Sequence, residues 1–258
     1  MPRAKLLAIG YELLNGEVRD RNLYTLITTL AQAGITIEAA ALVGDDLQRI
    51  AAFILWFLAD APDLLVLCGG LGPTPDDATL AAVAQALQRP LRESSVARKM
   101  VEKHYQRLMA SGYLQALSPE EPRRKMATLP EGAEPLPNPR GTAPAVRLRH
   151  NDTWIYCLPG VPEELEAILH ESVLPEVRAR FHGQPPARAE LIIHVDDEAS
   201  LAAALRATQA HFPDVYLKSM ARAFPAAREE GIHIIAIAAQ MDRAQAALIA
   251  LEKQLGRH

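Results

Sequence analysis

The first 90 residues alternate short apolar runs with segments of helical spacing, and this alternation limits the fold more than any other feature of the sequence. Residues 5–9 form an apolar run that Gly10 ends, and apolar side chains at helical spacing follow over residues 22–33. The alternation continues with strands predicted at residues 35–42 and 64–68 and helices predicted at residues 46–59 and 75–87. Such an order predicts right-handed crossovers and a parallel sheet with helices on both faces. A sheet of this kind binds ligands at the carboxyl ends of its strands.

The remaining residues predict a continuation of this sheet followed by a smaller domain. The expected elements are a helix at residues 94–110, a polar and partly helical segment at 119–125, a hairpin of strands 145–148 and 154–158, and a helix from 162 to about 178. Gly and Pro gather at residues 181–187, which predicts a linker between a domain of residues 1–180 and a second domain of residues 188–258. The second domain shows the order strand, helix, strand, strand, helix at residues 188–194, 198–212, 215–220, 231–239 and 242–254, which indicates a small α+β domain.

Charge and hydropathy disfavour some classes of partner. The 27 Lys and Arg residues are outnumbered by 31 Asp and Glu residues, so the basic surface that neutralises nucleic-acid phosphates is not expected. The longest apolar run, residues 50–59, has ten residues, whereas a membrane span needs roughly 20. The N-terminus lacks a signal-peptide pattern, and Cys68 and Cys157 show neither a disulfide framework nor metal-ligand spacing. We therefore expect a cytoplasmic protein without a membrane or nucleic-acid partner.

A glycine-rich segment between a predicted strand and a predicted helix is the strongest candidate for a ligand site. It consists of Gly69, Gly70, Leu71, Gly72, Pro73, Thr74, Pro75, Asp76 and Asp77. Glycines there let backbone N–H groups approach an anion, and a helix N-terminus adds unpaired donors, so the expected ligand is a phosphate or diphosphate. The same residues also resemble a helix cap, with Thr74 as N-cap, Pro75 at the first helical position and Asp77 three residues after the cap. A Walker-type sequence and a complete dinucleotide fingerprint are both missing, which disfavours a kinase or dehydrogenase.

Five motifs, in order along the chain, resemble those of one known family. They are the segment from Gly10 to Gly16 followed by Asp20 and Asn22, the segment from Val43 to Asp46, the segment from Gly69 to Asp77 with Thr79, the segment from Gly141 to Pro144, and the segment from Leu158 to Glu163. In these motifs the chain is similar to the competence/damage-inducible protein CinA family. The resemblance implies a three-layer α/β/α sandwich of the molybdopterin-binding MoaB/Mog type, followed by a small KH-like α+β domain.

The resemblance to CinA proteins also implies an activity, a metal-dependent ADP-ribose pyrophosphatase with Mg²⁺, Mn²⁺ or Co²⁺ as cofactor. Diphosphate hydrolysis needs charge neutralisation on the non-bridging oxygens and a positioned water. Asp45 and Asp77 stand at positions similar to the functional aspartates of the MoaB/Mog fold and are the expected catalytic residues; with Asp76 they are the candidate metal ligands. Asp46 is expected to cap the following helix. The candidate substrate-binding residues are Gly10, Glu12, Asn22, Gly69, Gly70, Leu71, Gly72, Thr74, Gly141, Thr142, Pro159 and Gly160.

Two other functions fit the same residues. A molybdopterin-handling protein would hold a pterin phosphate on the same loop, and a non-catalytic ligand-binding or scaffold protein would be consistent with Ala145. Ala145 stands where the family usually has glycine, and its methyl group is expected either to crowd the pocket or to limit the local backbone. The family's C-terminal deamidase domain is not expected within these 258 residues.

The expected partners are a small nucleotide or pterin phosphate and further copies of this chain in a homo-oligomer. The KH-like domain lacks the Gly-x-x-Gly loop that clamps nucleotide backbones, because Gly231 is the one glycine between Arg188 and Leu255. This domain is therefore expected to serve interaction or dimerisation.

Overall fold

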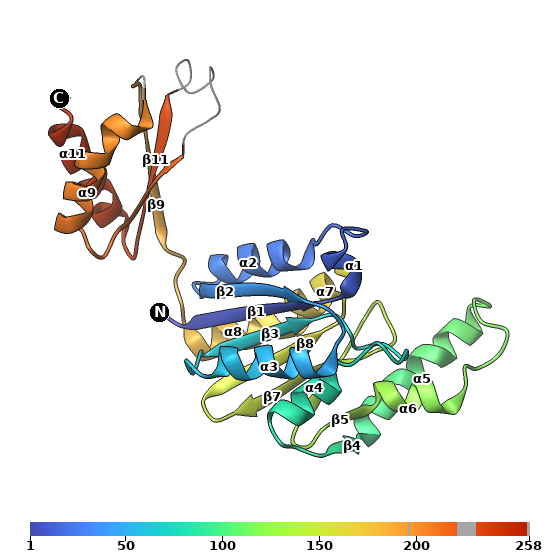
Figure 1. Cartoon of the computed structure of the whole chain (residues 1–258). Helices are drawn as coiled ribbons and strands as arrows, with labels where there is room; N and C mark the ends of the chain where they lie inside the picture. Colours follow the sequence, from blue (N-terminus) through green and yellow to red (C-terminus); the bar gives the residue numbers. More distant parts are fainter. Residues whose placement is uncertain (196, 221–230, 257–258) are drawn as a thin grey trace. The chain divides into compact units, whose positions relative to one another are not determined.

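A computed structural model describes residues 1–195, 197–220 and 231–256 of the chain. The chain divides into two compact units, Met1–Gly183 and Gln184–His258 (Figure 1). The first unit contains two clusters of buried apolar side chains, and the second unit contains a third cluster of its own. All the candidate site residues belong to the first unit.

The first unit is built on a mixed six-stranded sheet. Its strands are β1 (Arg3–Ile9), β2 (Thr36–Val43), β3 (Leu64–Cys68), β6 (Glu134–Leu136), β7 (Ala145–His150) and β8 (Thr153–Leu158). They lie in the order β2-β1-β3-β8-β7-β6, in which the first four strands run parallel and the β8–β7 and β7–β6 pairs are antiparallel. The predicted hairpin is formed by β7 and β8. A separate two-stranded sheet pairs β4 (Leu91–Glu93) with β5 (Thr128–Pro130).

Helices cover both faces of the six-stranded sheet, as the sequence pattern predicts. The helices of the first unit are α1 (Tyr11–Leu14), α2 (Asn22–Gln32), α3 (Leu47–Leu58), α4 (Thr79–Ala86), α5 (Ser95–Ala110), α6 (Glu120–Met126), α7 (Pro162–Ile168) and α8 (Leu174–Phe181), with a π-helical segment η1 (Leu169–Val173) between the last two. The α3 and α4 helices lie on one face of the sheet, and α2, α7 and α8 lie on the other (Figure 1). No helix in the described part of the chain is long and apolar enough to cross a membrane.

The two cores of the first unit are built from alternating side chains of the central strands. In β1, Leu7 packs with the α3 and α4 side chains, whereas Leu6 packs with those of α2 and α7. In β3, Leu65 belongs to the first core and Val66 to the second. Because successive side chains of a strand point to opposite faces, a strand covered on both sides must be apolar throughout. The short apolar runs of the sequence therefore account for the three-layer α/β/α architecture.

The second unit contains a three-stranded antiparallel sheet. Its elements are β9 (Ala187–Ile193), η2 (Glu198–Leu201), α9 (Ala202–His211), β10 (Tyr216–Met220), β11 (Ile232–Ala238) and α11 (Met241–Gln254). The strand order β10-β11-β9 places β11 in the centre. Side chains from α9 and α11 pack with one set of strand side chains to form the core of this unit.

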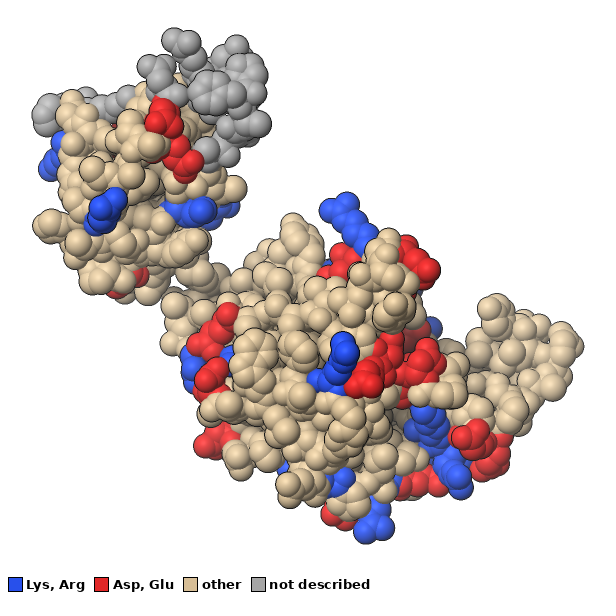
Figure 2. Space-filling model, viewed as in Figure 1, with Lys and Arg blue, Asp and Glu red and all other residues tan. Residues whose placement is uncertain are grey.

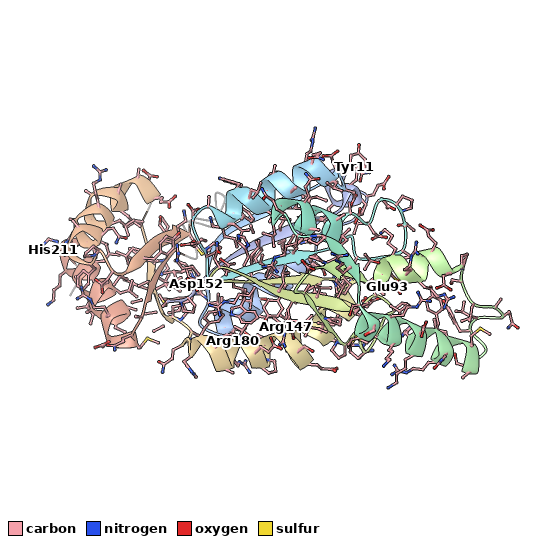
Figure 3. All side chains as sticks on the ribbon, turned by 90° about the horizontal axis from the view of Figure 1, so that it is seen from below. Tyr11, Glu93, Arg147, Asp152, Arg180 and His211 are labelled. Carbon is pink, nitrogen blue, oxygen red and sulfur yellow. The ribbon has the colours of Figure 1, made fainter. Side chains whose placement is uncertain are left out.

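A hydrogen-bonded cluster joins β8 to α8 in the first unit. Tyr156 is fully buried, and its hydroxyl donates to Glu176 Oε2 at 2.7 Å. Arg147 pairs with Glu176 and with Glu134, and it lies near Arg180 of α8 (Figure 3). Burial and the Glu176 carboxylate raise the pKa of Tyr156 well above its ordinary range, so the hydroxyl stays protonated and remains a donor.

Loss of the Tyr156 hydroxyl is expected to destabilise the first unit. In Tyr156→Phe the ring still fills its site, but the Glu176 carboxylate loses a donor, so the free energy of unfolding should fall by about 1–3 kcal/mol. Urea unfolding followed by circular dichroism measures the change. Tyr24→Phe, at a tyrosine that is 73% exposed, is the matched control and should leave the midpoint unchanged. Equal midpoints for the two variants would show that the buried hydroxyl does not stabilise the fold.

Candidate functional site

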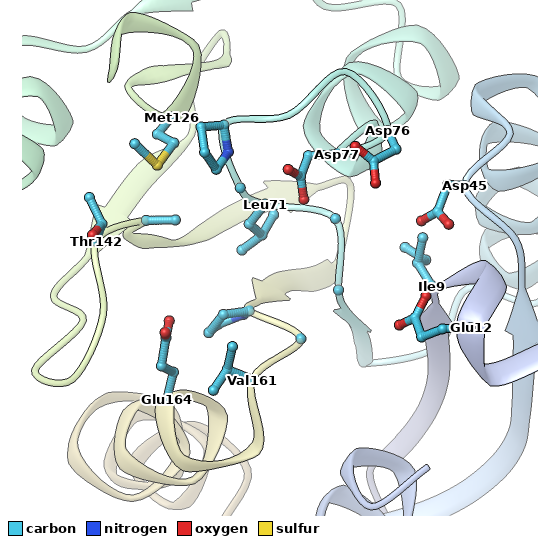
Figure 4. Close-up of a pocket in the computed structure, with 18 of the residues that line it drawn as sticks. Ile9, Glu12, Asp45, Leu71, Asp76, Asp77, Met126, Thr142, Val161 and Glu164 are labelled. Carbon is cyan, nitrogen blue, oxygen red and sulfur yellow. The ribbon is translucent and has the colours of Figure 1, made fainter. Parts of the chain in front are cut away.

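A cavity of about 580 Å³ lies at the carboxyl ends of β1, β3 and β8 (Figure 4). The predicted site residues that line it are Gly10, Glu12, Asp45, Gly69, Gly70, Leu71, Gly72, Asp76, Asp77, Thr142, Pro159 and Gly160. Three other predicted residues, Asn22, Thr74 and Gly141, are not among the lining residues. Acidic side chains gather beside this end of the sheet (Figure 2). The structure thus brings together residues from five separate sequence motifs.

The glycine-rich loop has a shape that requires glycine at its start. Gly69 has a φ of +102°, and a Cβ there would lie 2.1 Å from the Ile9 carbonyl oxygen. Buried Thr79 fixes the loop, because its hydroxyl donates to Gly69 O at 2.7 Å and its N–H donates to Gly70 O at 3.2 Å.

Three backbone amides of this loop are available to a ligand. Within the part of the chain that the structure describes, the N–H groups of Gly70, Leu71 and Gly72 have no hydrogen-bond partner, and all three residues line the cavity. Successive free amides in a loop form a concave site that suits an anion. The sequence predicted donors from the loop glycines and from the helix N-terminus; the first N–H of α4 is not free, because it is bonded to Gly70 O.

Asp77 closes a turn within this loop. The Thr74 N–H and hydroxyl donate to Asp77 Oδ2 at 2.9 and 2.7 Å. Because α4 begins at Thr79, the prediction of a helix from Pro75 with Thr74 as its N-cap is wrong. Thr74 contributes to the shape of the loop, whereas the Asp77 carboxylate also lines the cavity.

Two neighbouring aspartates after β2 have different positions. Asp46 caps α3, as predicted, because its Oδ1 accepts the Arg49 N–H at 2.8 Å. Asp45 lines the cavity, and its Oδ2 accepts the Tyr11 N–H at 2.8 Å. In Figure 4, Asp45 lies on the same side of the cavity as Glu12 and Asp76. The Tyr11 contact therefore holds a carboxylate at the cavity wall.

Lys125 of α6 supports the glycine-rich loop, although no sequence motif singles it out. Its Nζ donates to Gly72 O at 3.0 Å and to Asp77 O at 2.7 Å. Desolvation lowers the pKa of Lys125, and the negative charges of Asp77 and Asp76 oppose that shift. The Thr74 hydroxyl, the backbone amide of Asp76 and the Lys125 charge hold the pKa of Asp76 below its ordinary value. Asp76 is therefore ionised at neutral pH.

Glu164, in the first turn of α7, is a further carboxylate at the cavity that the sequence did not single out. Asn138 Nδ2 donates to Glu164 Oε2 at 2.7 Å, and Asn138 Oδ1 accepts the Gly141 N–H at 2.8 Å. A Cβ at Gly141 would lie 2.1 Å from the Glu164 carboxylate. Gly141 therefore leaves room for Glu164 and does not line the cavity itself. The acidic first turn after the Leu158 to Glu163 motif was the one sequence signal for this residue.

Asn22 supports the cavity wall from outside. It is buried, and its Nδ2 donates to Gly160 O at 2.7 Å. Gly160 approaches the glycine-rich loop so closely that a Cβ there would lie 3.3 Å from Gly69 Cα. Asn22 therefore positions Gly160 at the cavity wall, and its contact with substrate stays a prediction.

The charged side chains that line the cavity are all acidic. Among its described lining residues there is no Lys, Arg or His, whereas five carboxylates are present, those of Glu12, Asp45, Asp76, Asp77 and Glu164. Like charges repel most strongly where water is partly excluded, so a diphosphate needs a cation to bind beside these acids. None of the described side chains that line the cavity carries the positive charge that a diphosphate would need.

The carboxylates fit a cation that is shared with a ligand. Among the residues described, no three His, Cys, Asp or Glu side chains converge closely enough to hold a metal ion. Mg²⁺ usually keeps several waters and binds one or two carboxylates together with substrate phosphates. Asp45, Asp76 and Asp77 are therefore suited to a hydrated cation that also contacts phosphate, and unsuited to an ion held by protein alone.

Ala145 does not crowd this cavity. It is the first residue of β7, it is fully buried in the core that includes α2, α7 and α8, and it is not a lining residue. Positive φ angles among described residues other than glycine occur at Ala61, Gln88, Asn151 and His182, so Ala145 is not strained either. The expected effect of this departure from the CinA motif is therefore not found.

Comparisons with known proteins agree on one family. A family model described as the probable molybdopterin binding domain matches residues 5–179. A protein of Thermococcus kodakarensis is 41% identical over 203 residues, which cover 79% of each chain. A CinA-like protein of Frankia casuarinae is 40% identical over 183 residues, which cover 71% of this chain and 41% of that longer protein. The crystal structure of the protein CinA from Thermoplasma acidophilum, described as of unknown function, is similar with a TM-score of 0.61 and 32% identity, covering 68% of this chain and 98% of that one. The chain belongs to the CinA family, and its first unit matches the family described as the probable molybdopterin binding domain.

Proposed function

We propose that the protein is a metal-dependent hydrolase that cleaves the diphosphate of ADP-ribose or a related nucleotide. The observation that carries this proposal is the pairing of three free loop amides, on Gly70, Leu71 and Gly72, with a cavity wall of carboxylates. The amides suit phosphate oxygens, and the carboxylates suit the cation that a diphosphate brings with it. A cavity of about 580 Å³ also has the size of a small-molecule site, since such sites span about 300–1,000 Å³.

Each group at the cavity has a task in this reaction. The loop amides bind non-bridging oxygens of the diphosphate and fix its position. Asp45 and Asp77, with Asp76 beside them, would hold the cation together with the diphosphate. When bound, the cation neutralises charge on the phosphate oxygens and lowers the pKa of a coordinated water.

The hydrolysis consumes one water molecule for each diphosphate that is cleaved. The water oxygen forms a bond to one phosphorus, the bridging P–O bond breaks, and AMP and ribose 5-phosphate leave. A carboxylate of the cavity accepts the proton that the water gives up. Thr74 and Lys125 keep Asp77 and the loop in place during this step, since both hydrogen-bond to the Asp77 turn.

A second candidate is a protein that binds molybdopterin. The match of residues 5–179 to the probable molybdopterin binding domain favours it. A pterin phosphate would use the same loop amides, so the geometry of the loop alone does not separate the two ligands. Turnover of a diphosphate separates them.

Hydrolysis of ADP-ribose is expected only with a divalent cation. Purified protein is incubated with ADP-ribose and Mg²⁺, Mn²⁺ or Co²⁺, and AMP is quantified by chromatography. Chelation with EDTA should abolish AMP release, and added metal should restore it. An AMP level no higher than that of Asp77→Ala would remove the hydrolase proposal. Tight molybdopterin binding without ADP-ribose turnover would favour the second candidate, and binding of either ligand without turnover would favour a non-catalytic protein.

A further inference from the structure

A second pocket, with a volume of about 200 Å³, lies against the glycine-rich loop. Residues 70–72 and Asp77 line both this pocket and the cavity of the proposed hydrolase site. The other residues that line the pocket are Leu80, Ala81, Leu91, Glu121, Arg124, Lys125 and Thr128. They come from α4, β4, α6 and β5, which lie beside one another in Figure 1. The glycine-rich loop, with its three free amides, is therefore a wall that the two spaces share.

The last turn of α6 also borders both spaces. Arg124 and Lys125 line the second pocket, and the next residue, Met126, lines the cavity. Lys125 Nζ already donates to Gly72 O and Asp77 O, which occupies two of its three N–H groups. Lys125 therefore holds the shared wall in place, and Arg124 is the basic residue of the pocket that can contact a ligand.

The Arg124 guanidinium differs from its neighbours because it has no partner. It is exposed, and within the part of the chain that the structure describes it makes no hydrogen bond or ion pair. Arg98 of α5 and Arg123 of α6 both pair with Glu120. The Glu121 carboxylate, which also lines the pocket, is exposed and equally without a hydrogen bond or ion pair among the described residues. The pocket thus offers one unpaired cation and one unpaired carboxylate to a ligand.

Three leucines make the rest of the pocket apolar. Leu71 and Leu80 are 5% and 9% exposed, and Leu91 is 42% exposed. An apolar surface gains free energy when a carbon-rich group covers it, but it gains none from a phosphate. A guanidinium stacks on the face of an aromatic ring, and a carboxylate accepts hydrogen bonds from an amino group. The three features together fit a flat nitrogen heterocycle that carries an amino group.

The volume of the pocket fits a ring system of this kind. One water takes about 30 Å³ in the liquid, so about 200 Å³ has room for roughly six or seven groups of that size. A single phosphate would leave most of this space empty. A complete small-molecule site spans about 300–1,000 Å³, so the pocket has the size for one part of a ligand. The cavity on the other side of the loop has room for the remaining part.

We propose that this second pocket, called the ring pocket below, binds a bicyclic nitrogen heterocycle of the same ligand whose phosphate lies on the loop amides. Arg124 stacks on one face of the ring, the leucines cover the ring from the other sides, and Glu121 accepts a hydrogen bond from its amino group. The inference rests on the proposed function in one respect, that the loop amides hold a phosphate of this ligand. The purine of ADP-ribose and the pterin of molybdopterin share this chemistry, and the experiment below distinguishes them.

Binding of ligands with and without the ring tests the ring pocket and needs no turnover. AMP and ribose 5-phosphate carry their phosphate on the same carbon of the same sugar, but only AMP carries the purine. Isothermal titration calorimetry of the full chain with Mg²⁺ should give AMP a dissociation constant about tenfold or more below that of ribose 5-phosphate. Titration with 6-hydroxymethylpterin phosphate is the corresponding measurement for a pterin.

Two changes in the ring pocket should weaken only the ligand that carries the ring. Arg124→Ala removes the stacked guanidinium, so the dissociation constant of that ligand should rise about three- to tenfold, while that of ribose 5-phosphate stays nearly the same. Ala81→Leu fills part of the ring pocket from α4 and should have the same selective effect. Arg107→Ala is the matched control, because Arg107 is an exposed arginine of α5 that does not line the pocket, and it should bind both ligands as wild type does.

The outcomes separate the ring pocket from the hydrolase proposal. Tighter binding of AMP identifies the ring as a purine, and tighter binding of the pterin phosphate identifies it as a pterin. If neither ring-bearing phosphate bound more tightly than ribose 5-phosphate, or if Arg124→Ala weakened all three ligands equally, the ring pocket would be refuted and the hydrolase proposal would stand. Selective loss in Arg124→Ala, in a protein that does not turn over ADP-ribose, would remove the hydrolase proposal alone. Binding of none of the three phosphates would overturn both.

Discussion

Asp45→Asn is expected to slow ADP-ribose hydrolysis by about 10²-fold or more, because it removes one negative charge from the group that holds the cation. Asparagine has nearly the same shape, and its carbonyl oxygen can still accept the Tyr11 N–H that Asp45 Oδ2 accepts at 2.8 Å. The local turn should therefore remain intact while the charge is lost. Initial rates of AMP formation at saturating Mg²⁺ measure the effect.

Asp46→Asn is the matched control for this prediction. Asp46 is the next residue in the chain, but its carboxylate caps α3 through the Arg49 N–H and is not a lining group of the cavity. Asparagine is as good an N-cap as aspartate, so the control should retain the wild-type rate and stability. Equal losses of activity in the two variants would show that general surface charge, and not a carboxylate at the cavity, governs the reaction.

Gly69→Ala is expected to lower the free energy of unfolding by about 3 kcal/mol or more. The φ of +102° strains any residue with a Cβ, and the added carbon would lie 2.1 Å from the Ile9 carbonyl oxygen. Ile9 is the last residue of β1, which lies between β2 and β3 in the sheet, so its backbone cannot move away without loss of strand pairing. Urea unfolding gives the change, and soluble variant protein should also lose ADP-ribose binding.

Gly16→Ala separates the two causes of this loss. Gly16 also has a positive φ, +79°, but a Cβ there would have no atom within 4 Å. This variant should cost only the left-handed conformation, about 1–2 kcal/mol. If Gly69→Ala were no more costly than Gly16→Ala, the close approach of the glycine-rich loop to β1 would not be a constraint on the fold.

The architecture of the first unit could be predicted because its signals are local. Each central strand is a short apolar run, and each flanking helix shows apolar side chains at helical spacing, as at Leu23, Leu26 and Leu30. Each pattern shows whether a strand or helix is buried on one face or on both, and it can be recognised from neighbouring residues alone. Motifs at the ends of several strands then converge because the carboxyl ends of parallel strands lie at one edge of the sheet.

The residues that hold the site residues in place could not be predicted, because their contacts join parts of the chain that lie far apart in the sequence. Lys125 reaches the carbonyls of Gly72 and Asp77 across about 50 residues of chain, and Asn138 positions Glu164 across 26 residues. No periodicity marks such residues. They are found only when the fold places α6 and the segment after β6 beside the cavity.

The glycine-rich segment shows a different limit, since its local signal fits two structures. Thr74, Pro75 and Asp77 have the spacing of a helix cap, but the same side-chain contact from Asp77 to Thr74 also closes a turn in a loop. Thr79 decides between them, because its bonds to Gly69 and Gly70 start the helix four residues later than the pattern suggests. The start of the loop is fixed in addition by β8, because the Gly69 N–H donates to Leu158 O at 3.0 Å.

The position of the phosphates in a ligand complex tests the proposed site most directly. A crystal structure with the non-hydrolysable α,β-methylene analogue of ADP-ribose and Mg²⁺ should show phosphonate oxygens about 2.7–3.2 Å from the N–H groups of Gly70, Leu71 and Gly72. The cation should lie between those oxygens and the carboxylates of Asp45 and Asp77. An analogue bound with its phosphonates away from the loop, or loop amides bonded to other protein groups in the complex, would contradict the site.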